Sequence, residues 1–429
     1  MTYEKLIKTI SDGALDAHFA LLYPDASAES ARARYLDAIE EFVKLYGNHG
    51  EISLFSVPGR SELSGNHTDH NHGRVIACSI DLDIIAVARH REDSVIRLKS
   101  AGFPEDVVDI AQFNAPRSDR FGRSNALIAG VCAGLVKDGY AVGGFDAYTT
   151  SNVLKGSGLS SSAAFEDMVG NILNHLYNSG RIDYIEISKI SQFAENKYFG
   201  KPCGLMDQVA CAAGGIVSID FADPAAPVVH QVNIDFTAAG YCLCIVDTGG
   251  NHADLTADYA AVPAEMKAVA AHFGKTCLRE VDEEQLIPAI PALREKCGDR
   301  AILRALHFFN ENRRVASQLE CLEQGDLPGY FSDVIASGRS SFCYLQNVYT
   351  TVNVAEQGLS LALCLAESYL SALDLPTAYR VHGGGFAGTI QAYVPRDSVA
   401  GFKALMDATF GDSACAVLHI RPEGAIKLI

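Results

Sequence analysis

The sequence predicts an α+β protein of two domains, with the functional site in the cleft between them. Its 429 residues are enough for two domains, and a hydrophobic content of 48% can fill a core in each. Strand-like and helix-like patterns occur together in both halves of the chain. Between residues 215 and 235 the stretch DFADPAAP has the composition of a loop. We therefore place the domains at residues 1–215 and 216–429.

Helices and strands alternate in the first half. Residues 1–48 have helical patterns, including SAESARARYLDAIEEFVKLYG, where serines can cap the start of a helix and a glycine can end it. The turn-bounded, β-branched stretches ISLFSVP and RVIACSIDLDIIAVARHR predict strands on either side of a polar loop. Further along, the patterns predict a helix at 124–139, a strand at 144–154, and helices at 164–176 and 183–199.

The second half continues the alternation without internal repeats or low-complexity tracts. Mixed elements in both halves are the basis of the α+β prediction. The patterns predict strands at 216–220 and 241–248, helices at 258–272, 300–323 and 354–372, and a strand-turn-strand unit around the glycines at 383–385.

The composition argues against several classes of protein. A net charge of −17 does not suit a nucleic-acid surface, because phosphate contacts need clustered lysine and arginine. No apolar run reaches the roughly 18 residues of a membrane span. The first residues have the pattern of an amphipathic helix and not of a signal peptide. The twelve cysteines include no CxxC pair and lie in apolar stretches, which favours reduced thiols in a cytoplasmic protein.

The stretch GSGLSSSAA at residues 156–164 is the strongest motif for phosphate binding. Glycines after a strand let the backbone approach a ligand, and the helix that follows offers free N–H groups and a positive dipole end. Three serines add hydroxyls for phosphate oxygens or a hydrated magnesium ion. An ordinary capped helix after a flexible turn would have a similar sequence. Neither the Walker spacing nor the three-glycine dinucleotide pattern fits.

Glu195 and Asp207 are the candidate acidic pair. Asp207 lies in the apolar run GLMDQVACAAGG, so we expect it to be buried beside a charged or hydrogen-bonding partner such as Arg60. Phosphoryl transfer needs a group that orients the nucleophile, a metal ligand and a cation near the transferred phosphate. Asp207, Glu195 and Arg60 would supply one of each. A structural ion pair or a helix cap is the alternative.

The loop between the first two predicted strands gathers short polar side chains. Asn66, His67 and Asp69 offer donors and acceptors that suit neighbouring sugar hydroxyls. The histidines of HTDHNH also match part of the H-x-H-x-D-H metal-binding pattern of binuclear hydrolases, although Gly65 replaces the first histidine. A hydrophilic hairpin turn is the third alternative. Near the C-terminus, HGGGFAG at 382–388 permits a tight turn with positive φ beside a ligand, or an ordinary hairpin.

Four motifs in order resemble the galactokinase branch of the GHMP small-molecule kinases. They are P-G-R-x-x-L-x-G-x-H-T-D-x-N, GSGLSSSAA, PCGLMDQ and GGGFAG, and the similarity runs from about residue 50 to the C-terminus. The resemblance implies a two-domain GHMP kinase fold with ATP and a sugar in the interdomain cleft. It also implies transfer of the γ-phosphoryl group of MgATP to the anomeric C1 hydroxyl of a hexose.

By position, the resemblance implies roles for individual residues. Asp207 would orient or deprotonate the C1 hydroxyl, and Arg60 would polarise it and steady the developing charge. Glu195 and Ser162 would hold magnesium. The phosphate loop would comprise Gly156, Ser157, Gly158, Leu159, Ser160, Ser161 and Ser162, the sugar contacts would be Asn66, His67, Asp69, Gly204 and Tyr259, and Gly383, Gly384 and Gly385 would shape the floor of the site.

Several positions depart from the family pattern. Asn66 stands where galactokinases have the glutamate that binds the C6 hydroxyl, so a charge is lost and a donor is added. SELSG replaces V-N-L-I-G, HNHG replaces tyrosine-asparagine-x-G, and Ala387 replaces a glycine. At 340–354, SSFCYLQNVYTTVNV stands where the family has acidic residues and then a P-E-L-D run after R-S. A pocket with altered partners discriminates differently among sugars.

We therefore predict an ATP-dependent sugar 1-kinase that acts on galactose or a closely related sugar. The alternatives are a kinase of N-acetylgalactosamine, arabinose or galacturonate, and a non-catalytic sugar and nucleotide sensor on the same fold. The predicted cofactors are ATP and Mg²⁺. We expect no nucleic-acid or membrane partner, and a monomer or weak dimer in the cytoplasm.

Overall fold

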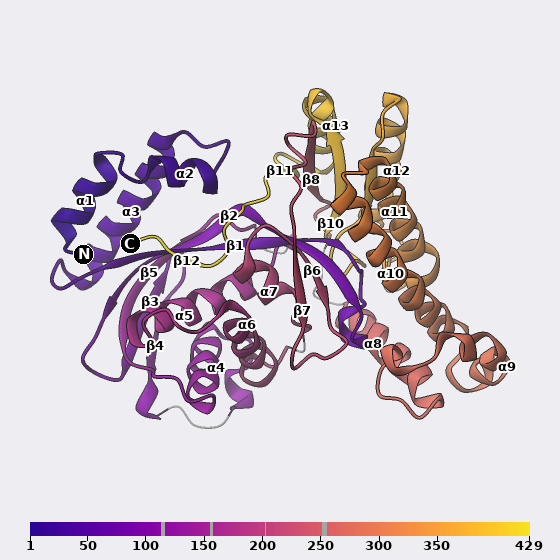
Figure 1. Cartoon of the computed structure of the whole chain (residues 1–429), viewed down its shortest axis with the longest axis horizontal. Coiled ribbons are helices and arrows are strands. Elements are labelled where there is room, and N and C mark those ends of the chain that lie inside the picture. Colours follow the sequence, from indigo (N-terminus) through magenta and orange to yellow (C-terminus); the bar gives the residue numbers. More distant parts are fainter. Residues whose placement is uncertain (113–115, 155–157, 202, 251–254) are drawn as a thin grey trace.

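Two β-sheets organise the structure, a computed structural model that describes residues 1–112, 116–154, 158–201, 203–250 and 255–429. The larger, eight-stranded sheet has the order β12-β1-β2-β5-β3-β4, and β6 and β7 extend it beside β2 (Figure 1). Its strands are β1 (Ser53–Ser64), β2 (Arg74–His90), β3 (Val95–Ser100), β4 (Glu105–Asp109), β5 (Phe145–Ser151), β6 (Ile216–Asp220), β7 (Val228–Val232) and β12 (Ile426–Lys427).

Helices pack on both faces of the larger sheet. One group packs against its lower face in Figure 1 and shares a core with its strands, and the N-terminal helices pack on part of the opposite face, where Leu54, Ile85 and Val87 join their separate core. The lower face is covered by α4 (Ser124–Lys137), α5 (Ser161–Tyr177), α6 (Tyr184–Phe193) with its π-helical continuation (Ala194–Phe199), and α7 (Met206–Ala213), and part of the opposite face by α1 (Tyr3–Ser11), α2 (Asp16–Leu22) and α3 (Ala28–Tyr46).

The smaller sheet is antiparallel and has the order β11-β8-β10-β9. On β8, Cys242, Cys244 and Val246 pack against α12 and α13, whereas Leu243 and Ile245 face the core shared with α10 and α11. The elements of this half are β8 (Tyr241–Asp247), α8 (Thr256–His272), α9 (Leu286–Cys297), α10 (Asp299–Gln324), α11 (Leu327–Ser340) with a π-helical end (Ser341–Leu345), α12 (Gly358–Leu370), β9 (Ala378–Val381), β10 (Thr389–Pro395), α13 (Val399–Phe410) and β11 (Cys415–Leu418).

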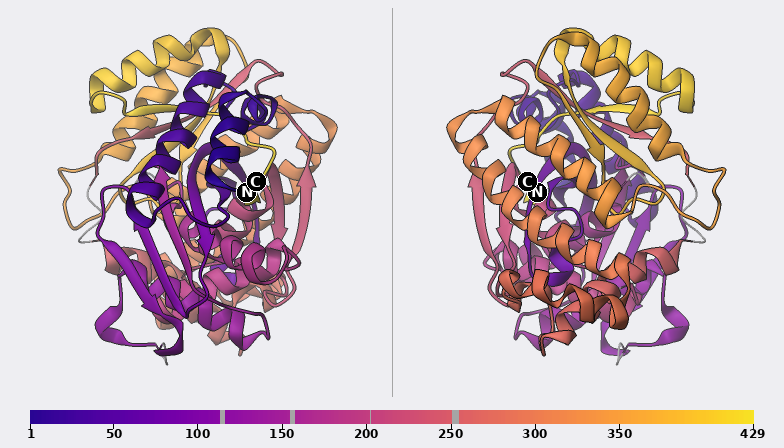
Figure 2. Two further views of the ribbon diagram at one scale, coloured as in Figure 1. Left: turned by 90° about the vertical axis from the view of Figure 1, so that its left-hand side faces the viewer. Right: turned by 90° about the vertical axis from the view of Figure 1, so that its right-hand side faces the viewer.

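Both ends of the chain meet at β1. The last strand, β12, pairs with β1, and the N-terminal amino group donates to the Ile52 carbonyl at 3.1 Å. Figure 2 shows the two termini side by side. The C-terminal residues therefore belong to the larger sheet, although the smaller sheet precedes them in the chain.

The predicted mixed α+β fold is confirmed, with one correction that bears on the site. Strand β1 does not end at Pro58 but continues to Ser64, because its far end pairs with β2, Ser64 lying opposite Ile76. The residues from Arg60 onward are therefore strand, and only 65–73 form the loop.

The sequence patterns did not predict β3, β4, β7, β11, β12, α7, α9, α11 or α13. These elements are short or carry contrary local signals; α9, for example, contains Pro291 inside the helix. Among the described helices, none combines the length and the apolar character needed to cross a membrane.

The division at residue 215 stays a prediction. The sheets themselves change over later, because β6 and β7 hydrogen-bond into the larger sheet. The chain enters the smaller sheet only at Tyr241.

Candidate active site

An arginine on β1 lies where three distant segments meet. The register of β1 shifts between Pro58 and Arg60, an irregularity that can redirect a side chain. Arg60 Nε donates to Asp207 Oδ1 at 2.7 Å, and Arg60 Nη2 lies 2.6 Å from Oδ2. Arg60 Nη1 donates to the Gly158 carbonyl, and the Arg60 backbone N–H donates to the Leu159 carbonyl at 3.1 Å. The structure thus brings Arg60, Asp207 and the serine-rich stretch together.

Asp207 occupies the first turn of α7, where a helix favours negative charge. Its side chain keeps 28% of its surface exposed, so it is less buried than expected. The Ser160 hydroxyl donates to Oδ2. Burial by itself would raise the pKa of Asp207, but the Arg60 charge and the hydrogen bonds from Ser160 and Arg60 outweigh it and hold the pKa below its usual value. Asp207 is therefore ionised at neutral pH.

The serine-rich stretch leads into the N-terminus of α5. Gly158 and Ser160 have positive φ angles of 71° and 57°, and such a conformation costs a serine free energy and is found at ligand-binding turns. The 17-residue helix starts at Ser161, so its first N–H groups can receive an anion. The Leu159 side chain is buried, which leaves only its backbone for a ligand. Gly156 and Ser157 lie outside the described residues.

Glu195 lies in the π-helical end of α6, an irregularity common at functional sites. It is buried, and Oε1 accepts from Ser162 Oγ at 3.2 Å and from Lys201 Nζ at 3.0 Å. Oε2 accepts from Gln208 Nε2 at 3.0 Å, so the residue after Asp207 also supports Glu195. The oxygens of Ser162 and Glu195 are of the kind that Mg²⁺ prefers.

His67 lies on the loop between β1 and β2 with its ring buried. Its Nε2 lies 2.9 Å from the Gly384 carbonyl, which can only accept, so Nε2 carries the proton. Burial and the neighbouring His70 lower the pKa of His67 to about 3. The ring is therefore neutral, and Nδ1 is an acceptor that has no hydrogen-bond partner among the described residues.

Asp69 and Gly204 lie against each other. Asp69 Oδ1 accepts from the His70 backbone N–H at 2.9 Å. A methyl group on Gly204 would overlap Asp69 Oδ2, so only glycine allows this approach. The loop at 65–73, which we call the sugar loop after its expected ligand, and the turn before α7 therefore meet at this point.

Asn66 and Tyr259 use their polar groups within the protein. Asn66 is 1% exposed, and its amide has no hydrogen-bonding capacity left for a sugar hydroxyl, contrary to the expectation from the sequence. The Tyr259 hydroxyl donates to the Gly385 carbonyl at 2.6 Å, and its ring lies edge-on to Phe386.

The glycine turn between β9 and β10 receives hydrogen bonds from the residues expected at the sugar. Gly383 and Gly385 have positive φ angles of 65° and 78°. The carbonyls of Gly383, Gly384 and Gly385 accept from Asn66, His67 and Tyr259, respectively. The glycine turn is thus hydrogen-bonded both to the loop at 65–73 and to α8.

Sequence reasoning missed Lys201 and His382. The His382 ring is buried, with Nε2 3.1 Å from Ser61 Oγ and Nδ1 2.9 Å from Thr389 Oγ1, and it packs beside Gly158. His382 begins the HGGGFAG motif, and Lys201 directly precedes the PCGLMDQ motif. The motifs therefore pointed to these two regions, but functional roles were predicted only for the residues beside Lys201 and His382.

The histidines of HTDHNH face different partners. His67 faces Gly384, whereas His72 Nδ1 lies 3.5 Å from Cys277 Sγ. Within the described ranges, no three His, Cys, Asp or Glu side chains form a group that could hold a metal ion. The structure therefore gives no support to the metallohydrolase alternative.

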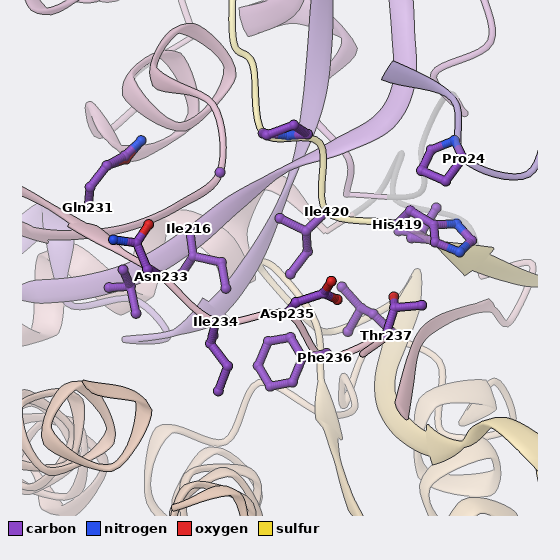
Figure 3. A pocket seen from close by; sticks show the side chains of 15 residues that line it. Pro24, Ile216, Gln231, Asn233, Ile234, Asp235, Phe236, Thr237, His419 and Ile420 are labelled. Carbon is purple, nitrogen blue, oxygen red and sulfur yellow. The ribbon is translucent and has the colours of Figure 1, made fainter. Parts of the chain in front are cut away.

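Two hollows lie away from the Arg60–Asp207 pair. One of about 600 Å³ is bordered by Asn233, Asp235 and His419 (Figure 3). Another of about 540 Å³ lies beside Phe386, next to the glycine turn. Neither contains Arg60 or Asp207, so the chemistry of the side chains, and not cavity size, identifies the candidate site.

The chain is similar to known kinases along most of its length. Residues 40–90 match the galactokinase galactose-binding signature, and residues 126–215 match the N-terminal domain of GHMP kinases. The galactokinase of Streptomyces coelicolor is 33% identical over 376 residues, which cover 86% of this chain and 91% of the relative. The galactokinase of Clostridium tetani is 27% identical over 371 residues, or 85% of this chain and 89% of the relative.

Solved structures share the fold. Lactococcus lactis galactokinase complexed with galactose has a TM-score of 0.77 at 25% identity, covering 92% of this chain and 100% of that one. Methanococcus jannaschii mevalonate kinase has a TM-score of 0.60 at 13% identity, and the match covers 87% of this chain and 99% of that one. Fold and site together define a GHMP kinase. Within that class the chain belongs to the galactokinase family, and it is an ATP-dependent sugar kinase.

Proposed function

We propose that this kinase transfers the γ-phosphoryl group of ATP to the anomeric C1 hydroxyl of galactose or a closely related sugar. The observation that carries the proposal is the Arg60–Asp207 ion pair, which is tied to the serine-rich turn through Gly158 and Leu159. The match to the galactose-binding signature and the likeness to a galactokinase complexed with galactose support galactose as the substrate.

Asp207 orients the C1 hydroxyl for in-line attack by accepting its hydrogen bond. A general base works best when its pKa lies near the working pH, whereas the pKa of Asp207 is lowered. This favours a role in orientation: as the new O–P bond forms and ADP leaves, the hydroxyl becomes strongly acidic and its proton passes to Asp207. Arg60 stays charged beside Asp207 and stabilises the negative charge that develops on the reacting oxygens.

The N-terminus of α5 receives the ATP phosphates through its backbone N–H groups and the Ser161 hydroxyl. Ser162 and Glu195 fit a magnesium site, since a hydroxyl and a carboxylate oxygen lie 3.2 Å apart there. A bound Mg²⁺ would neutralise phosphate charge. Lys201 adds a positive charge at the same place, 3.0 Å from Glu195.

The sugar lies against the loop that carries His67 and Asp69. His67 Nδ1 accepts from one hydroxyl, and the Asp69 carboxylate accepts from neighbouring hydroxyls. Gly204 leaves room for Asp69 and the sugar together. Tyr259 supports the glycine turn.

Further parts of the proposal concern the working form of the enzyme. N-acetylgalactosamine, arabinose and galacturonate are the alternative substrates. We also propose Mg²⁺ as the required ion, a monomer or weak dimer, and a cytoplasmic location, which the unpaired state of all twelve cysteines supports.

The direct test is ADP release from ATP and Mg²⁺ with galactose and the three alternative sugars, followed by phosphorus NMR of the product. We expect fastest turnover with galactose and a phosphate on C1. Asp207→Asn keeps the shape but removes the charge, so kcat should fall roughly 10³-fold while nucleotide binding persists. Asp119→Asn, in an exposed ion pair with Arg117, is the matched control. No turnover with any of the sugars, or full activity of Asp207→Asn, contradicts the proposal.

A further inference from the structure

Asn66 belongs to the loop at 65–73 and lies at the centre of a buried hydrogen-bond network. Its side chain makes four hydrogen bonds: Nδ2 donates to Glu62 Oε1 at 3.0 Å and to the Gly383 carbonyl at 2.6 Å, and Oδ1 accepts from Asn347 Nδ2 at 2.8 Å and from Ser341 Oγ at 3.3 Å. An amide offers two donors and two acceptor positions. The protein therefore uses the whole capacity of this side chain.

The chemistry of the partners determines which way the amide points. The Gly383 carbonyl can only accept, and Glu62 Oε1 also accepts from the Arg380 guanidinium, so Nδ2 must lie on this side. Asn347 Nδ2 donates to the Gly384 carbonyl at 3.2 Å as well, so Asn347 turns its nitrogen toward Asn66. A side chain at position 66 must donate on one side and accept on the other.

These bonds join segments that are far apart in the sequence. Glu62 is near the end of β1, Gly383 is in the glycine turn, and Asn347 follows the π-helical end of α11. The backbone carbonyl of Asn66 also accepts from His307 Nε2 on α10 at 2.9 Å. Asn66 thus ties the sugar loop to the second half of the chain.

The next residue, His67, carries the acceptor that we assign to the sugar. Its φ angle of 59° is positive, a conformation that costs free energy and persists only where the surroundings enforce it. Asn66 holds the chain on one side of this residue, and the bond from Nε2 to the Gly384 carbonyl holds the ring. The position of His67 Nδ1 therefore depends on Asn66.

We propose that Asn66 is a positioning residue for sugar binding: its amide holds His67 in place through Glu62, Gly383 and Asn347 and does not itself contact the sugar. The inference rests on the proposed sugar-kinase function. A carboxylate at position 66 would point acceptors at the Glu62 carboxylate and the Gly383 carbonyl, and the buried groups would lose their donors. An amide is therefore required at this position.

Asn66→Asp removes both donors at almost constant size. We expect the KM for galactose to rise about tenfold or more, with the KM for ATP within about twofold, since α5 is outside the network. Adding Glu62→Gln supplies a donor that can reach the introduced carboxylate, so the galactose KM should recover by about threefold or more. Asn347→Ala removes one donor to Asn66, so this variant should raise the KM for galactose and leave the KM for ATP unchanged.

Asn174 offers a matched control. Its buried amide makes bonds of the same type away from the site, donating to the Ile182 carbonyl at 2.9 Å and accepting from the Ile182 N–H at 3.1 Å. Asn174→Asp should lower the melting temperature without changing the galactose KM.

Hydrogen–deuterium exchange gives a readout that is independent of turnover. Asn66→Asp should speed exchange in residues 65–73 and 383–386, and the double variant that also carries Glu62→Gln should exchange more slowly again. Asn174→Asp should leave exchange in both segments unchanged.

Unchanged galactose KM and unchanged exchange in Asn66→Asp overturn the inference. A parallel rise of both KM values, matched by Asn174→Asp, also overturns it, because that pattern shows general destabilisation. Wild-type protein that phosphorylates none of the sugars refutes the proposed function instead, and the exchange pattern then still decides whether Asn66 holds the loop.

Discussion

The Arg60 guanidinium contacts two partners at the candidate site through three nitrogens, and this depends on its planar shape. Nε and Nη2 bind both oxygens of Asp207, and Nη1 binds the Gly158 carbonyl. A lysine ammonium has the same charge but not this fork of donors. Arg60 therefore aligns the Asp207 carboxylate with the turn at 158–160 and also supplies charge.

Arg60→Lys should lower kcat roughly 10²- to 10³-fold with little change in the KM for ATP, because the charge stays but the alignment is lost. Steady-state kinetics with galactose and ATP measure this effect. Arg117→Lys is the matched control, since Arg117 makes a similar fork to Asp119 on the surface. A kcat within a few-fold of wild type would remove the aligning role from Arg60.

At the scale of elements, the turn before α7 and the loop after β1 approach each other closely. Gly204 lies in the first and Asp69 in the second, with no space for a Cβ between them. The first turn of α7 also carries Asp207, so the loop at 65–73 and the carboxylate proposed to be catalytic share one support. Any displacement of this turn should affect the sugar more than ATP.

Gly204→Ala should raise the KM for galactose by about tenfold or more, because the methyl group displaces Asp69. Gly274→Ala is the comparison: Gly274 has a positive φ of 69° and nothing near its Cβ position. That variant should lose about 1–2 kcal/mol of stability with an unchanged galactose KM. If Gly204→Ala binds galactose normally, the close approach does not matter for the site.

Elements with strong local periodicity were predictable, and elements stabilised by distant partners were not. The helices α5 and α10 match their predicted ranges closely. Strand β12, by contrast, has only Ile426–Lys427 and exists because β1 offers a partner. The π-helical segment that carries Glu195 has no pattern that distinguishes it from the α-helix before it.

At the scale of the whole molecule, three buried histidines join the two halves of the chain. His67 bonds to the Gly384 carbonyl, His307 to the Asn66 carbonyl, and His382 to Ser61. Burial is the largest cause that lowers the pKa of each ring below its usual value, to about 3 for His67. All three are neutral in the folded protein at neutral pH.

These three histidines should therefore lower the stability as the pH drops below about 6.5. The unfolded chain then binds protons that the folded chain excludes, so each histidine contributes a slope of up to about 1.4 kcal/mol per pH unit until its folded pKa is passed. The pKa values of His419, raised by its hydrogen bond to Asp81, and of Glu166 and Asp167, raised by burial, act in the opposite direction. Urea unfolding of wild type and of His307→Gln between pH 7.5 and 5 isolates the histidine contribution, with the exposed His90→Gln as a control. A His307→Gln variant with the same pH dependence as wild type contradicts this account.

Much of the candidate site was predictable, because its motifs are contiguous. The stretch around Ser160 and the carboxylate of Asp207 carry local signals of a turn before a helix and of a polar group in an apolar run. The role of Asn66 was not predictable from such signals. An amide side chain in a polar loop suggests contact with sugar hydroxyls. The partners of Asn66 within the protein, however, use all of its hydrogen-bonding capacity.

By itself, the sequence determined the class of protein and its chemistry, because periodicity sets the helices and strands and short motifs place phosphate-binding and acidic groups. Only the tertiary structure decided which polar side chains keep hydrogen-bonding capacity that the protein does not use. Asn66 bonds to Asn347 and Gly383, which are 281 and 317 residues further along the chain. Hydrogen bonds across such separations leave no periodic trace, since each needs one specific partner that folding alone brings into place.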